Sequence, residues 1–248
     1  MTYDVPPPRR PIGAVRISTV ALLGVVVAVS VPTVAAALAV SGRVSDEHAT
    51  IAIDSGGPVT RVVVEDSGSD VTITGEAAAT TVVGSAEVQW KGKNGPRPRL
   101  RQSLANGVLT LSKDCSDGAC GPVDITLRVP KGVSVRAVTS DGRIQVMNVD
   151  GGVDLTSTNS DVEGYGLGSG DASFDTRDGA VRASFTGAPA RISVKTTNGD
   201  VDLATDGRTP YRTTADTTDG TRDIENLSDP RATAVIVVST TEGNVSVK

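Results

Sequence analysis

Three aspartates that recur in the C-terminal half, Asp141, Asp178 and Asp219, are the residues whose type and spacing could do acid–base chemistry. In stacked strands about 4.8 Å apart they would lie two repeats, roughly 9 to 10 Å, from one another. That distance touches the upper end of the range of about 6.5 to 9.5 Å that separates the carboxyl groups of inverting glycosidases. Aspartate and asparagine also tolerate turn dihedral angles, and alternating them keeps like charges off adjacent strands. We therefore predict turns at these positions and assign no catalytic residue.

Metal chemistry has few candidate ligands in this sequence. Calcium wants six to eight oxygens, and the acidic turns reproduce neither the EF-hand loop nor the calcium-binding nonapeptide repeat. Cys115 and Cys120 flank Asp117-Gly118, a tight turn that could bring the two thiols together. In an oxidising compartment we expect a disulfide, because the alternative zinc site needs about four ligands and the single histidine, His48, lies far away. We predict no metal and no cofactor.

A basic segment stands out on an acidic background. Beyond residue 16 the chain carries 21 basic and 28 acidic residues, a balance that argues against nucleic acid as a partner. Within it, twelve consecutive residues hold five cations and the only tryptophan of the chain: Trp90, Lys91, Lys93, Arg97, Arg99 and Arg101. This segment could grip anionic envelope polymers or lipid headgroups by charge with an aromatic anchor. The alternative is a solvated loop whose tryptophan caps the core.

The elements that carry these residues form a repeat of 18 to 23 residues. Aspartate, asparagine or glutamate stands before the turn position, threonine or serine stands three residues before it, and apolar residues alternate on both sides. The turn position is taken in six copies by Gly142, Ser160, Gly179, Gly199, Gly220 and Gly243. Each copy therefore reads as two alternating strands around a sharp turn.

This pattern, with only 2% aromatic residues, predicts an all-β fold with a thin core of Val, Ile, Leu and Ala. We expect a β-solenoid, or parallel β-helix-like repeat array, because the columns keep residue type as well as polarity. An antiparallel β-sandwich is the alternative, since Asp-Gly and Asn-Gly also favour hairpins. The connections between copies lengthen along the chain, from 147–152 to 225–235, so their edge is a candidate contact surface.

An apolar segment precedes the array. Residues 17–40 contain no charged residue and would span about 36 Å as a helix, enough to cross about 30 Å of hydrocarbon. Three arginines precede the segment and only Arg43 follows it closely, which predicts a cytoplasmic N-terminus and an extracytoplasmic body of a single-pass plasma-membrane protein. The alternative is a signal peptide cleaved near Ala39, which would leave the body secreted.

The sequence thus predicts five regions. They are a disordered cytoplasmic tail, a transmembrane anchor or signal segment, a linker, an irregular N-terminal β region with the cysteine pair, and the six-copy array. Their ranges are 1–16, 17–40, 41–50, 51–130 and 131–248.

The repeated Asp/Asn-Gly-x-Val-x-Val units, of which residues 199–203 with Asn198 are one, resemble those of the bacterial putative-adhesin families of unknown function. The likeness covers roughly residues 51–248. It implies a β-helix-like fold behind a membrane anchor and a surface location, and it carries no catalytic residues over to this chain.

We expect a non-enzymatic extracytoplasmic module with an adhesive, structural or interaction role at the cell envelope. Its partners would be the membrane, through residues 17–40, and anionic envelope polymers or other envelope proteins. An envelope-stress sensing or signalling accessory protein is a second class of function, and a carbohydrate-active β-helix enzyme is a third.

Overall fold

The computed structural model describes residues 46–115 and 121–248, all of which belong to the compact unit Arg43–Lys248. The described residues form strands, turns and loops without helix, so the all-β prediction is confirmed. Among these residues no helix is long and apolar enough to cross a membrane. The predicted tail and the predicted transmembrane segment, residues 1–16 and 17–40, lie outside the described residues.

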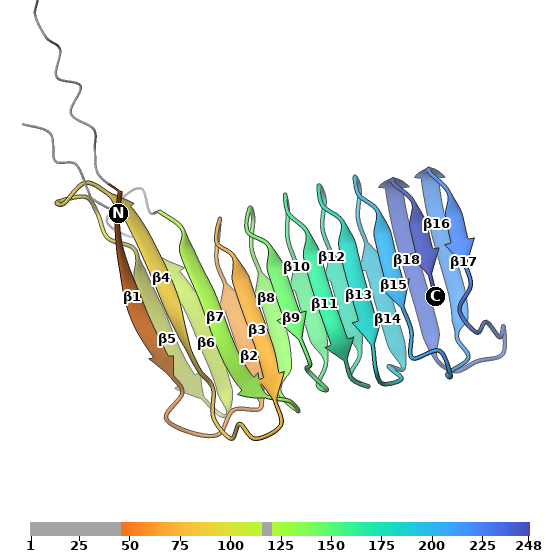
Figure 1. The fold of residues 1–248 in the computed structure, drawn as a ribbon, viewed down its shortest axis with the longest axis horizontal. Helices are drawn as coiled ribbons and strands as arrows, with labels where there is room; N and C mark the ends of the chain where they lie inside the picture. Colours follow the sequence, from red (N-terminus) through yellow and green to blue (C-terminus); the bar gives the residue numbers. More distant parts are fainter. Residues whose placement is uncertain (1–45, 116–120) are drawn as a thin grey trace, which may run out of the picture. The chain divides into compact units, whose positions relative to one another are not determined.

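The strands form two sheets (Figure 1). In spatial order, sheet A consists of β1 (Asp46–Asp54), β4 (Val83–Lys91), β7 (Val123–Pro130), β3 (Val71–Glu76), β9 (Ile144–Met147), β11 (Val162–Leu167), β13 (Val181–Phe185), β15 (Val201–Ala204), β19 (Val245–Val247) and β17 (Arg222–Ile224). Sheet B consists of β16 (Arg212–Asp219), β18 (Val235–Glu242), β14 (Arg191–Lys195), β12 (Ala172–Asp175), β10 (Val153–Thr156), β8 (Ser134–Val138), β2 (Arg61–Glu65), β6 (Val108–Asp114) and β5 (Arg99–Ala105).

Each repeat copy places its first strand in sheet B and its second strand in sheet A, and we call such a pair a rung. Successive rungs pair in parallel and in register, so that Val153 lies between Val135 and Ala172, and Val181 lies between Val162 and Val201. Antiparallel pairs in the described part of the chain join only β1 with β4, β4 with β7, and β5 with β6. The hairpin pairing that the sandwich alternative requires is therefore confined to residues before 131.

The core lies between the two sheets. The inward-pointing residues of a copy lie five and seven positions before its turn residue in sheet B, and two and four positions after it in sheet A. Most of these positions hold Val, Ile or Leu at 5% exposure or less. Phe174 is an exception in size, and the absence of a side chain at Gly164 makes room for its ring.

Rungs also form before residue 131, in the region predicted to be irregular. β2 and β3 form the rung next to β8 and β9, and β6 and β7 form the rung beyond it. Leu109 thus lies beside Val62 as part of a first strand. The strand β1 begins at Asp46, inside the predicted linker 41–50, because its backbone pairs with β4 along its whole length.

The last two copies do not stack in chain order. β18 and β19 of the sixth copy lie between the fourth copy, β14 and β15, and the fifth copy, β16 and β17. The residues explain the exchange, because Ile236, Val238, Val245 and Val247 of the sixth copy are apolar and buried. The strands β16 and β17 of the fifth copy carry exposed polar residues. This copy is therefore suited to the end of the array, where a rung has a neighbouring rung on one side only.

Candidate binding surface

The predicted basic segment covers the end of β4, the connection 92–98 and the start of β5. Trp90, the penultimate residue of β4, points inward and is 8% exposed, and the guanidinium of Arg97 lies 4.8 Å from the centroid of its ring. Such a cation over an indole face is attracted by the ring quadrupole. The Trp90 Nε1 is buried and has no hydrogen-bond partner among the described residues. The tryptophan therefore does contact the core, as the capping alternative predicts, and it also carries a cation on its outer side.

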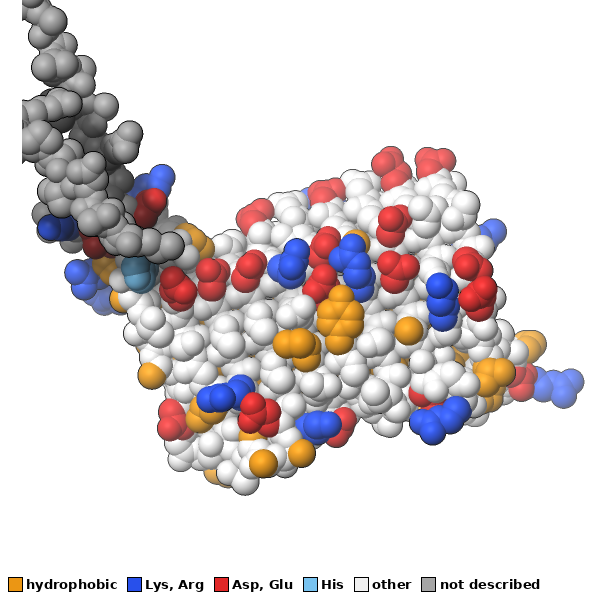
Figure 2. Space-filling view, in the orientation of Figure 1, with side chains coloured by type: hydrophobic (Ala, Val, Ile, Leu, Met, Phe, Trp, Pro, Cys, Tyr) orange, Lys and Arg blue, Asp and Glu red, His pale blue; other side chains and the backbone are white. Residues whose placement is uncertain are grey.

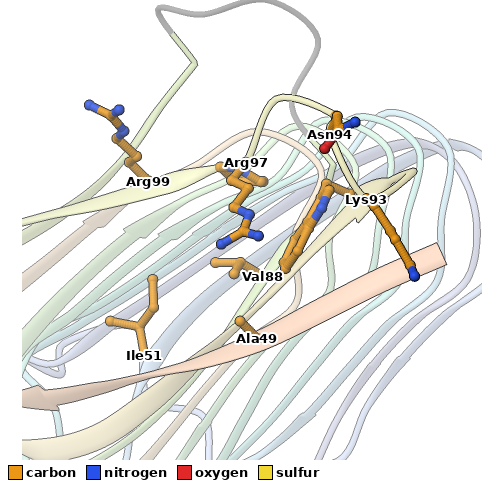
Figure 3. Close-up of a pocket in the computed structure, with 10 residues that line it drawn as sticks. Ala49, Ile51, Val88, Lys93, Asn94, Arg97 and Arg99 are labelled. Carbon is orange, nitrogen blue, oxygen red and sulfur yellow. The ribbon is translucent and has the colours of Figure 1, made fainter.

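An open groove of about 480 Å³ lies beneath this pair, and we call it the Trp90 groove (Figure 3). Its apolar floor comes from the inward faces of β1 and β4 and includes Ala49, Ile51 and Val88. Its rim comes from the end of β4, the β4–β5 connection and the start of β5. The rim residues are Trp90, Lys93, Asn94, Gly95, Arg97, Pro98 and Arg99.

Glycines shape this connection. Gly92 has a φ of +74°, which favours glycine, and the Gly95 N–H donates to the Gly92 carbonyl at 2.9 Å. A Cβ at Gly95 would lie 2.0 Å from the Lys91 carbonyl oxygen, so the turn excludes any larger residue. The turn folds the cation-bearing segment back, and Figure 3 shows the Arg97 side chain over the floor of the groove.

The six residues predicted to bind polyanions separate into three groups. Trp90, Lys93, Arg97 and Arg99 line the Trp90 groove. Lys91 lies on the outward face of β4, beside Asp46 and Pro122. Arg101 donates to Asp114 across the β5–β6 hairpin at 2.7 Å, so its charge is already matched. In the described part of the chain, neither Lys93 nor Arg97 forms an ion pair with an acidic side chain.

The repeat turns lie between the first and second strand of each rung, where neighbouring backbones approach closely. A Cβ at Gly142 would lie 1.6 Å from the Ser69 carbonyl oxygen, and one at Gly199 would lie 2.0 Å from that of Gly179. Gly179, Gly220 and Gly243 are restricted in the same way. Close stacking, rather than ligand binding, thus accounts for the glycine column.

The acidic turn column is engaged in contacts between rungs. The Asn159 amide donates to Asp141 Oδ1 at 2.6 Å, and the Asn198 amide donates to the Asp178 carboxylate. Asp141 and Asp178 therefore each accept a neighbour's amide, in the alternation that the sequence predicts. No group of three or more His, Cys, Asp or Glu side chains in the described ranges could hold a metal ion.

A second column of acceptors was not predicted from the sequence. One residue after the turn, Asp70, Asp161 and Asp200 accept the backbone N–H of the corresponding residue in the next rung, at 2.7 to 2.9 Å. The pKa of Asp161 is lowered: partial burial raises it, but the Ala180 N–H and the Arg182 guanidinium favour the charged form more strongly. The signal in the sequence that could have predicted this column is the aspartate or asparagine that directly follows the turn residue in alternate copies.

A charged cluster on the outward face of sheet A was also missed. Glu163 is 7% exposed, accepts from Gln145 at 3.0 Å and pairs with Arg182 at 3.3 Å. Burial and the neighbouring Glu163 charge raise the pKa of Tyr165. Figure 2 shows charged side chains around exposed hydrophobic ones near the middle of this face. Each of these residues stands at an outward position of its strand, where a polar residue is expected in any sequence. The cluster therefore forms only because the rungs stack.

Of the predicted cysteine pair, Cys115 directly follows β6, at the position where a rung turns from its first strand to its second. Cys120 lies outside the described residues, so the disulfide stays a prediction.

The connections between rungs, predicted as a contact surface, are packed against one another in the middle of the array. The Gly168 N–H donates to the Val149 carbonyl, and the Thr186 N–H donates to the Leu167 carbonyl. The first residues of the predicted connection 165–171 belong to β11. Successive connections along this edge are therefore stacked by backbone hydrogen bonds for several rungs. The connections differ from one another in the longer segments 204–212 and 225–235.

No protein-family model matches the chain, and no curated protein matches it. The solved structures that are similar to it include three from different bacteria. A protein described as a putative cell adhesion protein from Clostridium sporogenes has 10% identity and a TM-score of 0.46 over 82% of this chain and 99% of its own. A putative adhesin from Parabacteroides merdae has 12% identity and a TM-score of 0.32, over 84% and 97% of the two chains. A putative adhesin from Bacteroides fragilis has 14% identity and a TM-score of 0.29, over 81% and 97%.

Proposed function

We propose that this chain is a non-enzymatic interaction module of the cell envelope, a β-solenoid anchored through residues 17–40, which binds anionic polymers at the Trp90 groove. The observation that carries the proposal is the pairing of Arg97 with Trp90 at the rim of an open apolar groove. Ligands that carry phosphate or carboxylate groups on a partly apolar backbone would match both the cations and the floor.

Electrostatics supports this site over the rest of the surface. Apart from the five cations of residues 90–101, the chain beyond residue 16 has 16 basic residues against 28 acidic ones. Lys93 and Arg97 are free of ion pairs to the described acidic side chains, so an incoming anion need not displace a carboxylate. A cation that is already held against an aromatic ring also loses less side-chain freedom on binding.

Support for a non-enzymatic role comes from the acidic turns. Asp141 and Asp178 are both engaged by amides of the next rung, and they lie at close-packed turns without a flanking histidine or aromatic platform in the described chain.

Binding to immobilised polyphosphate and polyuronate, with neutral dextran as control, tests the proposal on the full-length chain in detergent. We expect salt-dependent retention on both polyanions, which falls about tenfold when Lys93→Ala and Arg97→Ala are combined. The matched control combines Arg208→Ala and Arg231→Ala, two exposed cations in the longer connections. Equal retention on dextran, or equal losses in the two double variants, would refute binding at the Trp90 groove.

A further inference from the structure

The Trp90 groove lies at the same end of sheet A as the point where the chain enters the fold. β1 and β4 run antiparallel with Asp46 opposite Lys91 and Glu47 opposite Trp90. The first residue of β1 is therefore a direct neighbour of the residue where the basic connection begins. Figure 1 shows the start of β1 and the β4–β5 connection at one end of the strands.

The length of the preceding segment restricts how far this end can lie from the apolar residues. Six peptide steps separate Val40 from Asp46, and a fully extended chain spans at most about 20 Å over that length. If residues 17–40 cross the membrane, as proposed above, the groove must lie within reach of the headgroup layer.

The distribution of charge indicates which part of the array would face an anionic membrane. The turn edge of the array carries exposed acidic residues along successive rungs, whereas cations gather at the end that holds β1 (Figure 2). The exposed acids include Asp141, Asp178, Asp219 and Glu242. An anionic membrane surface attracts lysine and arginine and repels carboxylates. The basic connection is thus the part of this edge that an anionic surface would favour.

The residues of the groove fit a lipid headgroup. Its floor is apolar, and its rim offers Lys93 and Arg97, the latter held over the ring of Trp90. Tryptophan and arginine are residues that settle at the boundary between hydrocarbon and water, where one end is apolar and the other is polar.

We infer that the Trp90 groove docks onto the anionic phospholipid headgroups of the same membrane in which residues 17–40 are anchored. The inference rests on the proposed function, since it needs both the anchor and anion binding at the groove. It narrows the ligand from anionic polymers in general to the lipid surface of the membrane that anchors the same chain. It also predicts that the first rungs are fixed to the membrane while the later ones project from it.

Trp90 is the only tryptophan, so its fluorescence reports the groove without labelling. The full-length chain is reconstituted in nanodiscs of phosphatidylcholine with or without 30% phosphatidylglycerol, each with about 5% headgroup-spin-labelled lipid. We expect strong quenching of Trp90 in the anionic discs, weak quenching in the neutral ones, and a docked fraction that salt reduces. Combining Lys93→Ala with Arg97→Ala should lower the docked-to-free ratio about tenfold or more, while Arg208→Ala with Arg231→Ala should leave it unchanged.

Quenching that is equal in neutral and anionic discs, or unaffected by the groove variants, would overturn headgroup docking. Absent quenching together with retention on polyphosphate would overturn docking in cis and leave the proposed function standing. Release of the chain from the discs as a soluble protein would reject the anchor, and with it both the inference and that part of the proposed function. A circular dichroism melt of each variant checks that the fold is retained.

Discussion

The hydroxyl of Thr196 donates a hydrogen bond of 3.1 Å to the carbonyl oxygen of Gly179, the turn residue of the preceding rung. The same contact recurs along the array. Equivalent pairs are Thr139 with Ser69, Ser157 with Gly142, Thr176 with Ser160, Thr217 with Gly243 and Thr240 with Gly199. A column of hydroxyls thus satisfies the turn carbonyls that the close stacking would otherwise shield from water.

Replacing this hydroxyl tests how much the column contributes to stability. Thr196→Val keeps the shape of the side chain but removes the donor, and Thr196 is only 3% exposed. We expect the free energy of unfolding to fall by about 1 to 2 kcal/mol, because the Gly179 carbonyl is left without this partner. Urea denaturation measures the change, and Thr196→Ser, which keeps the donor, is the control. Similar stabilities of the valine and serine variants would contradict this role.

The turn glycines should tolerate no side chain where neighbouring rungs touch. Gly199→Ala would place its Cβ 2.0 Å from the Gly179 carbonyl oxygen, so the two rungs must separate. A loss of about 2 kcal/mol or more, with a lower melting temperature, is expected from overpacking at a backbone contact. Gly132→Ala provides the control, because a Cβ there meets nothing within 4 Å. If both variants melt alike, close approach does not explain the glycine column.

The fit between Gly164 and Phe174 can be measured with a double-mutant cycle. A Cβ at Gly164 would lie 2.8 Å from Leu167 Cδ1 and 3.1 Å from Phe174 Cε1. Gly164→Ala should therefore cost about 1 to 3 kcal/mol in the native background and less when Phe174→Leu has made room. Additive costs would mean that the two residues do not share this space.

Asp161 should make stability depend on pH in the acid range. Its folded-state pKa is lowered, so its contribution is present above the unfolded value of about 3.9 and is lost as the pH falls through the folded pKa. Asp161→Asn should cost about 0.5 to 1 kcal/mol at pH 7, since Arg182 is partly exposed and its charge is screened. Urea denaturation at pH 7 and at about pH 2 should show the difference shrinking; a constant difference would contradict the ionic contribution.

The sequence predicted the features that each rung repeats. Val, Ile and Leu at alternate positions, Asp or Asn before the turn and Thr or Ser three residues earlier all recur because identical contacts recur between neighbours. These columns identified inward-facing residues such as Val153 and Val181, which lie where the pattern requires.

Features that depend on which rungs are neighbours could not be predicted. The sixth copy lies between the fourth and the fifth, an order that the columns alone do not distinguish from chain order. The backbone-accepting role of Asp161 needs the register of the next turn, and the Arg101–Asp114 ion pair needs the β5–β6 hairpin. The groove beneath Trp90 required β1, which pairs with β4 from outside the recognisable repeat.

The exchange of the last two copies has a consequence for the order in which the array forms as the chain emerges with its N-terminal end first. Every earlier copy from the first to the fourth finds a finished rung to add to as soon as it emerges, whereas β16 and β17 of the fifth copy pair only with the later β18 and β19. The fifth copy must therefore wait, unpaired, until the sixth has emerged and has added to the fourth. Growth of the array is sequential up to residue 204 and becomes a single joint step after it.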